Sequence, residues 1–216
     1  MYLGAALVVK QMKLDNLPFN WFDFFLLIWL GMGVFRGRKR GMSEELITFL
    51  QWIAIVVVCA LGYRPLGIWV HSMTKLTLLV SYVLSYLVIA GAVVGLFAFI
   101  NRLVGGKLVG SDVFGKAEYY LGMPAGMLRF ACMLLAGLAI LNARLYTQKE
   151  LQDYEKFQQD VYGSEYFPGL GVLQMDVFQR SLTGPVIHKY LAFVLIAPTP
   201  PGEASKFKQK EWSPTP

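Results

Sequence analysis

The sequence is poor in charged residues, which make up 16% of the chain against the roughly 25% usual in soluble domains. Hydrophobic residues reach 56%, and the mean hydropathy is +0.48. One stretch without any charged residue, residues 77–100, exceeds the ~20 residues that a bilayer core requires. The low charge therefore excludes an ordinary soluble domain and predicts insertion into a membrane.

Cysteine and histidine are also scarce, with two residues of each. Cys59 and Cys132 lie inside apolar runs, and no Cys-x-x-Cys pair or Cys/His spacing typical of metal ligands occurs. His71 and His188 stand far apart in the sequence without a neighbouring ligand, so we interpret them as interfacial or solvated side chains. We expect no metal site and no other bound cofactor.

Catalytic motifs are missing as well. The stretch Gly105-Gly106-Lys107 lacks the upstream glycine and the following hydroxyl residue of a phosphate-binding loop, so we interpret it as a turn. No set of acid, base and nucleophile can be assembled from the rest of the chain. The sequence thus predicts a protein that is not an enzyme.

Long apolar runs are what the sequence has instead. The predicted fold is all-α, a polytopic integral membrane protein with about four transmembrane helices, at about residues 19–35, 46–61, 77–100 and 121–143. A wetter segment, residues 62–75, separates the second span from the third, and its Trp and Tyr suit a membrane interface.

The net charge of +6 arises mainly in this membrane region. Its densest group of positive charge, which we call the basic cluster, comprises Arg36, Arg38, Lys39 and Arg40. The positive-inside rule places this cluster in the cytoplasm, and both termini then lie on the outer side. We expect the cluster to set topology and to face anionic lipid, and we expect no binding of nucleic acid.

The segments outside the predicted spans differ from one another. Residues 1–18 are expected to form a short retained segment, because no positive residue precedes their apolar start. Residues 144–162 predict an amphipathic helix facing water. The apolar segment 186–197 is too short to cross, so it lies in the interface or docks on a partner. The Pro-rich end, 198–216, is expected to be disordered or extended.

Small residues four positions apart occur in two of the predicted spans. Gly91 and Gly95 form one pair in the third span, and Gly122 and Gly126 form another in the fourth. Such pairs let helix backbones approach closely where lipid offers no hydrophobic drive for association. We predict that each pair marks a packing face, either within the protomer or between copies.

Asp23 and Arg129 are intramembrane charges, which carry a penalty of about 2.5–3.5 kcal/mol at a helix centre. A direct ion pair between them is disfavoured, because the predicted topology places them at depths that differ by roughly 10 Å. We expect Asp23 to be hydrogen-bonded near the outer interface and Arg129 to extend toward the inner surface. Glu118 should reach that inner surface, either as a partner of the basic cluster or as a solvated charge.

Two short motifs follow each other along the chain. The first comprises the span with Asp23, then Gly37-Arg38-Lys39-Arg40-Gly41, Glu45-Leu46 and Gln51-Trp52-Ile53. The second comprises Glu118, Gly122, Gly126 and Arg129. In residue type, spacing and order, these motifs resemble the colicin V production protein (CvpA) family over about residues 19–143. The chain departs from the family pattern at Phe130, where glycine is common, and at Tyr119, where a basic residue is usual.

This resemblance implies a four-span protein of the bacterial inner membrane, linked to colicin V production and envelope physiology. The leading hypothesis is a nonenzymatic protein that aids export or envelope maintenance by assembling with partners or with itself. In that hypothesis, residues 144–216 form a partner surface. A first alternative is an accessory subunit of a larger respiratory, photosynthetic or secretion complex. A second alternative is a small transporter or channel, suggested by Asp23 and Arg129.

Overall fold

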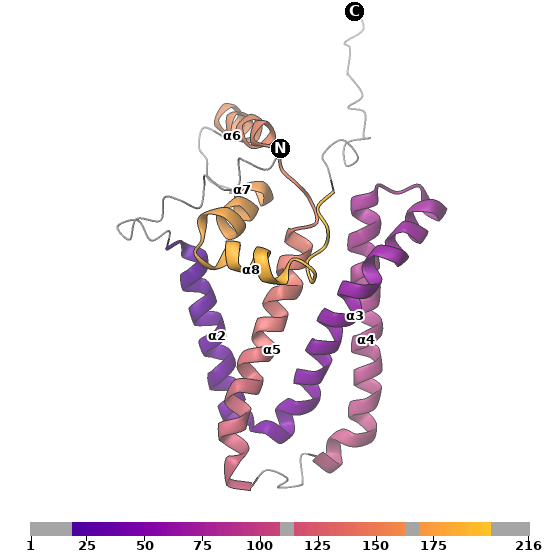
Figure 1. Ribbon diagram of the computed structural model, residues 1–216, viewed down its shortest axis with the longest axis vertical. Coiled ribbons are helices and arrows are strands. Elements are labelled where there is room, and N and C mark those ends of the chain that lie inside the picture. Colours follow the sequence, from indigo (N-terminus) through magenta and orange to yellow (C-terminus); the bar gives the residue numbers. More distant parts are fainter. Residues whose placement is uncertain (1–18, 109–114, 163–168, 200–216) are drawn as a thin grey trace, which may run out of the picture.

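The computed structural model describes residues 19–108, 115–162 and 169–199, and these residues contain helices but no named strand. The long helices are α2 (Trp21–Arg40), α3 (Met42–Thr74), α4 (Leu78–Leu108) and α5 (Glu118–Leu141) (Figure 1). The all-α fold predicted from the sequence is therefore confirmed. Residues 105–107, which we interpreted as a turn, belong to the last turns of α4. The predictions for residues 1–18 and for the Pro-rich end beyond residue 199 lie outside the described residues.

The four long helices are arranged in the order α2, α5, α3, α4 across the molecule (Figure 1). α5 packs against α2 on one side and α3 on the other, and α3 packs along α4. Gly41 alone separates α2 from α3, and the two helices diverge from it. Its φ of 80° lies in the left-handed region, which glycine adopts without steric penalty.

Three of the described helices are long and apolar enough to cross a membrane: α3, α4 within Leu78–Leu103, and α5. The sequence predicted about four spans, and the additional one, residues 19–35, corresponds to α2. This helix lies along α5, but it falls short as a span because Asp23 and the basic cluster leave only residues 24–35 free of charge. The described structure thus supports three spanning helices.

α3 extends well beyond the predicted end of the second span at residue 61. The segment that we interpreted as wet, residues 62–75, is helical up to Thr74 and forms the whole last third of this helix. Pro65 lies inside it and removes one backbone donor, and the helix bends in this part (Figure 1). Tyr63 still packs on α4, where its ring and that of Tyr82 are nearly perpendicular and their centroids lie 5.6 Å apart. The helix continues because its buried face still has a partner.

The chain after α5 folds back over one end of the helices. α6 (Gln148–Tyr162) is followed by α7 (Leu170–Met175), a π-helical turn η3 (Asp176–Arg180) and α8 (Thr183–Leu191). α7 and α8 lie across the ends of α2 and α5 (Figure 1). The predicted amphipathic helix at residues 144–162 corresponds to α6, which begins at Gln148.

The apolar segment 186–197 packs on helices of its own chain. Leu195 and Ile196 belong to the buried core. Asn142 Nδ2 at the end of α5 donates to the Ile196 carbonyl at 3.0 Å, and Ala197 N donates to the Tyr63 hydroxyl at 3.0 Å. The sequence left interfacial or partner docking open for this segment, and the structure places its end on α5 and α3.

Candidate functional site

α2 and α5 approach each other through four glycines. Gly33 and Gly37 of α2 face Gly126 and Gly122 of α5. A Cβ atom added at Gly33 would lie 2.9 Å from the Gly126 carbonyl oxygen, and one added at any of the other three would come closer still to the opposite backbone. The two backbones are therefore in direct contact, which only small residues permit.

The pair Gly122 and Gly126, which we selected from the sequence, thus lies within the protomer. We did not predict its partners, although Gly33, Gly37 and Gly41 repeat at the same spacing of four. Their signal was present, but Gly37 and Gly41 were considered only as part of the motif Gly37-Arg38-Lys39-Arg40-Gly41 around the basic cluster. The spacing rule that identified the α5 pair would also have identified the α2 pair.

Gly91 and Gly95 of α4 have a different environment. A Cβ atom added at either would meet no atom within 4 Å. These two glycines therefore form no packing face within the part of the protomer that the structure describes.

A buried ion pair lies where α2, α3 and α5 meet. Glu45, in the first turn of α3, is fully buried, and Arg129 of α5 is 4% exposed. Arg129 Nη1 lies 2.6 Å from Glu45 Oε1, while Arg40 Nη1 lies 3.7 Å from Glu45 Oε2. Within the described structure neither carboxylate oxygen accepts an aligned hydrogen bond, so the contact is chiefly electrostatic.

A second nitrogen of Arg129 and the hydroxyl of Ser43, two residues before Glu45 in the chain, also lack hydrogen bonds among the described residues. Both atoms, Arg129 Nε and Ser43 Oγ, are buried. Leaving a buried polar group unpaired carries a penalty of about 1–3 kcal/mol. Stability alone does not favour such a group of atoms, and ionisable residues at membrane depth are functional candidates by default. We therefore regard Glu45, Arg129 and Ser43 as the centre of the candidate site.

Arg129 was expected to extend toward the inner surface, and in the structure its guanidinium ends in a buried contact with Glu45, in the first turn of α3 next to the basic cluster. Glu45 was not predicted as its partner, because it lies at a helix start, where acidic residues are common for local reasons. Glu118 was a possible partner of the basic cluster, but it forms no ion pair with it in the described residues. It accepts a hydrogen bond from Ser43 N at 3.3 Å and lies against Gly41.

Asp23, in the first turn of α2, binds the start of α8, at the end of α2 opposite to the basic cluster. Its carboxylate is 3% exposed. Oδ1 accepts hydrogen bonds from Thr183 N at 3.1 Å and Thr183 Oγ1 at 2.7 Å, and Oδ2 accepts from Leu182 N at 3.0 Å and Asn20 N at 3.1 Å. One carboxylate thus caps the first turns of both α2 and α8. Asp23 and Arg129 do not pair with each other.

The pKa of Asp23 reflects two opposing effects at this position, which lies outside the three candidate spans. Desolvation by burial raises the pKa, but the hydrogen bonds from Leu182, Thr183 and Asn20 together bring it below the ordinary value of 3.8. Because the folded pKa is lowered, the contribution of Asp23 is present above the ordinary pKa. It is lost as the pH falls through the folded pKa.

We expect Asp23→Asn to loosen the docking of α8, because the amide keeps one acceptor oxygen and loses the charge that strengthens the bonds. Hydrogen exchange of residues 183–191 in detergent should become faster by about tenfold at neutral pH. Acidification of the wild type below its folded pKa should have the same effect, after correction for intrinsic exchange. Asp153→Asn, on the exposed side of α6, is the matched control. Equal exchange in both variants would contradict the role of Asp23.

Comparison with known proteins adds one finding. The family model described as colicin V production protein matches residues 22–170, which is more than half of the chain. The matched range contains the glycine interface, the Glu45–Arg129 pair and Asp23. No curated protein and no solved structure matches the chain.

Proposed function

The chain belongs to the colicin V production protein family and is a membrane protein, and from this we propose that it acts by assembly and not by catalysis. In this proposal it resides in the bacterial inner membrane with both termini on the outer side. It supports export or envelope maintenance by binding other membrane proteins or further copies of itself. Its helices provide the binding surface, and its buried charges fix how those helices are arranged.

The observation that carries the proposal is an uncovered face of α4. This face contains four exposed residues at helical spacing, Leu84, Val88, Gly91 and Gly95. The opposite face of α4 is buried against α3. Because lipid gives little drive for helix association, smooth faces with small residues are where membrane helices pack. The two glycines leave room for another helix backbone, which supports assembly through α4.

The transport alternative rested on Asp23 and Arg129. Both side chains have partners within the chain, Asp23 at α8 and Arg129 at Glu45. These contacts account for the two charges without a permeating ion, so assembly is favoured over transport. An accessory subunit remains a form of assembly, and it differs from self-association in the composition of the particle.

We expect gentle detergent extraction from native membranes to yield a particle larger than one protomer. Gly95→Leu should reduce the recovery of that particle by about tenfold, because the new side chain occupies the space of the partner helix. Gly137→Leu is the matched control, since it adds the same side chain at another open glycine, on α5. The measurement is cross-linking and mass of the purified particle, with its protein composition.

The outcomes separate the candidate functions. A homomer supports self-association, and a stoichiometric heteromer supports an accessory subunit. A wild-type protein that is monomeric under every mild extraction condition would contradict assembly. Solute or ion flux in liposomes that is lost on Glu45→Gln, with the fold intact, would favour transport instead.

A further inference from the structure

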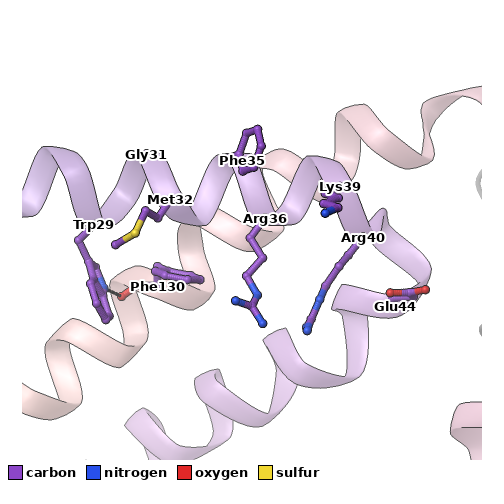
Figure 2. Close-up of a pocket in the computed structure, with 9 residues that line it drawn as sticks. All are labelled: Trp29, Gly31, Met32, Phe35, Arg36, Lys39, Arg40, Glu44 and Phe130. Atoms are coloured by element: carbon purple, nitrogen blue, oxygen red, sulfur yellow. Dashed lines mark hydrogen bonds between the residues drawn. The ribbon is translucent and has the colours of Figure 1, made fainter.

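A cavity of about 1010 Å³ lies along α2, bordered by α5 and the start of α3 (Figure 2). Its wall changes character along the axis of α2. Trp29 and Met32 of α2, together with Phe130 of α5, form an apolar end. Arg36 and Arg40 follow further along α2 and point into the space between the three helices (Figure 2).

The positive end of this cavity is largely uncompensated. Arg36 and Lys39 form no ion pair among the described residues, and Arg40 makes only the 3.7 Å contact with Glu45. Of the residues that line the cavity, only Glu44 is acidic. The cavity therefore has an excess of positive charge at this end, and it attracts an anion.

The apolar end has a fixed wall. Trp29 Nε1 donates a hydrogen bond to the Phe130 carbonyl at 3.0 Å, and the two rings lie 5.2 Å apart. The indole donor is thus satisfied by the protein, so this part of the cavity offers mainly apolar surface. A small soluble anion would gain no favourable contact from this apolar end.

We propose that the cavity binds one anionic phospholipid. The phosphate lies among Arg36, Lys39 and Arg40. The parts of the acyl chains nearest the headgroup lie along Trp29 and Met32. The volume is at the upper end of the roughly 300–1,000 Å³ typical of small-molecule sites and far exceeds what a phosphate ion needs. The positive end lies toward the end of α2 and the apolar end toward its middle, which matches the polarity of a lipid in one leaflet.

This proposal is more specific than the expectation that the basic cluster faces lipid. Only three of its four residues line the cavity, since Arg38 does not. Arg38 carries the same charge on the same helix, next to Lys39. It therefore distinguishes a discrete site from general attraction between a basic surface and an anionic membrane.

The test measures lipid binding to the full chain in nonionic detergent by native mass spectrometry. The probes are phosphatidylglycerol, phosphatidylcholine with the same acyl chains, and inorganic phosphate. We expect one phosphatidylglycerol to bind at least tenfold more tightly than phosphatidylcholine. Arg36→Gln and Lys39→Gln should each weaken phosphatidylglycerol binding about fivefold, while Arg38→Gln changes it less than twofold. The first two residues are exposed and unpaired among the described residues, so both variants should fold.

A variant at the apolar end tests the lipid tails independently of charge. Met32→Trp should fill that end and weaken both lipids about tenfold. Equal affinity for the two lipids, or an Arg38→Gln effect as large as that of Arg36→Gln, overturns the proposal. Displacement of the lipid by millimolar phosphate, or unchanged binding in Met32→Trp, also overturns it by indicating an anion site without acyl chains.

Discussion

Glu45→Gln is expected to destabilise the protein by about 3–5 kcal/mol, because it leaves the Arg129 guanidinium buried without a counter-charge. The substitution preserves shape and removes only the charge. For a chain of this size, each kcal/mol lowers the melting temperature by about 2–4 °C, so we expect a decrease of about 6–20 °C. Thermal unfolding of the detergent-solubilised protein, followed by circular dichroism, measures this shift.

Two further variants separate the pair from its surroundings. Glu44→Gln removes a charge one residue away, where the side chain is exposed, and should change stability by less than about 0.5 kcal/mol. Adding Arg129→Met to Glu45→Gln removes both buried charges and should restore most of the lost stability, because the only charge left without its partner is that of Arg40, which is exposed. If Glu45→Gln behaves like Glu44→Gln, the pair does not contribute to the folded state.

The double variant also addresses function. A buried ion pair is weak evidence for stability, because well-packed apolar residues of similar size often replace it without loss. If the pair only holds α3 against α5, a cell that produces the double variant should support export or envelope maintenance as well as a cell with the wild type. A folded double variant without activity would assign a functional role to the charges themselves.

The sequence predicted the helices well and their partners poorly. The length and apolarity of α4 and α5 are local properties, so an all-α membrane protein could be predicted from composition and runs alone. The number of spans was harder to predict. The additional predicted span, α2, has charges at both ends, and its position depends on its contact with α5, which no local pattern reveals. The extension of α3 past Pro65 was also missed, because it depends on packing against α4.

The pairing of charged residues shows the same limit. Asp23 was the only partner considered for Arg129, since these two residues were the only charges inside the predicted spans. Glu45 lies at a helix start in the sequence, and only the closeness of α2, α3 and α5 makes it a buried residue facing Arg129. Asp23 likewise finds its partners at Thr183 and Leu182, which no local pattern connects to the first helix. Local spacing predicts elements, and long-range contacts decide which charges meet.

Gly122→Ala is expected to separate α2 from α5 and to destabilise the protein by about 3 kcal/mol, although it adds a single methyl group. The added Cβ would meet the Gly37 carbonyl oxygen, and a backbone atom cannot rotate away as a side chain does. Gly137→Ala makes the same change on the same helix where no atom lies within 4 Å. It should be neutral or stabilising by about 0.5–1 kcal/mol, because alanine favours the helix. Thermal unfolding of both variants in detergent gives the comparison.

The glycine interface and the ion pair should also be coupled. Gly41 joins α2 directly to the first turn of α3, so a shift of α2 away from α5 also moves Glu45 relative to Arg129. The combined variant Gly122→Ala with Glu45→Gln should therefore lose less stability than the sum of the two single losses, by about 1 kcal/mol or more. Strictly additive losses would mean that α2 packs on α5 independently of the charges beside it. In that case the close approach of the glycines would not be what positions Glu45 for Arg129.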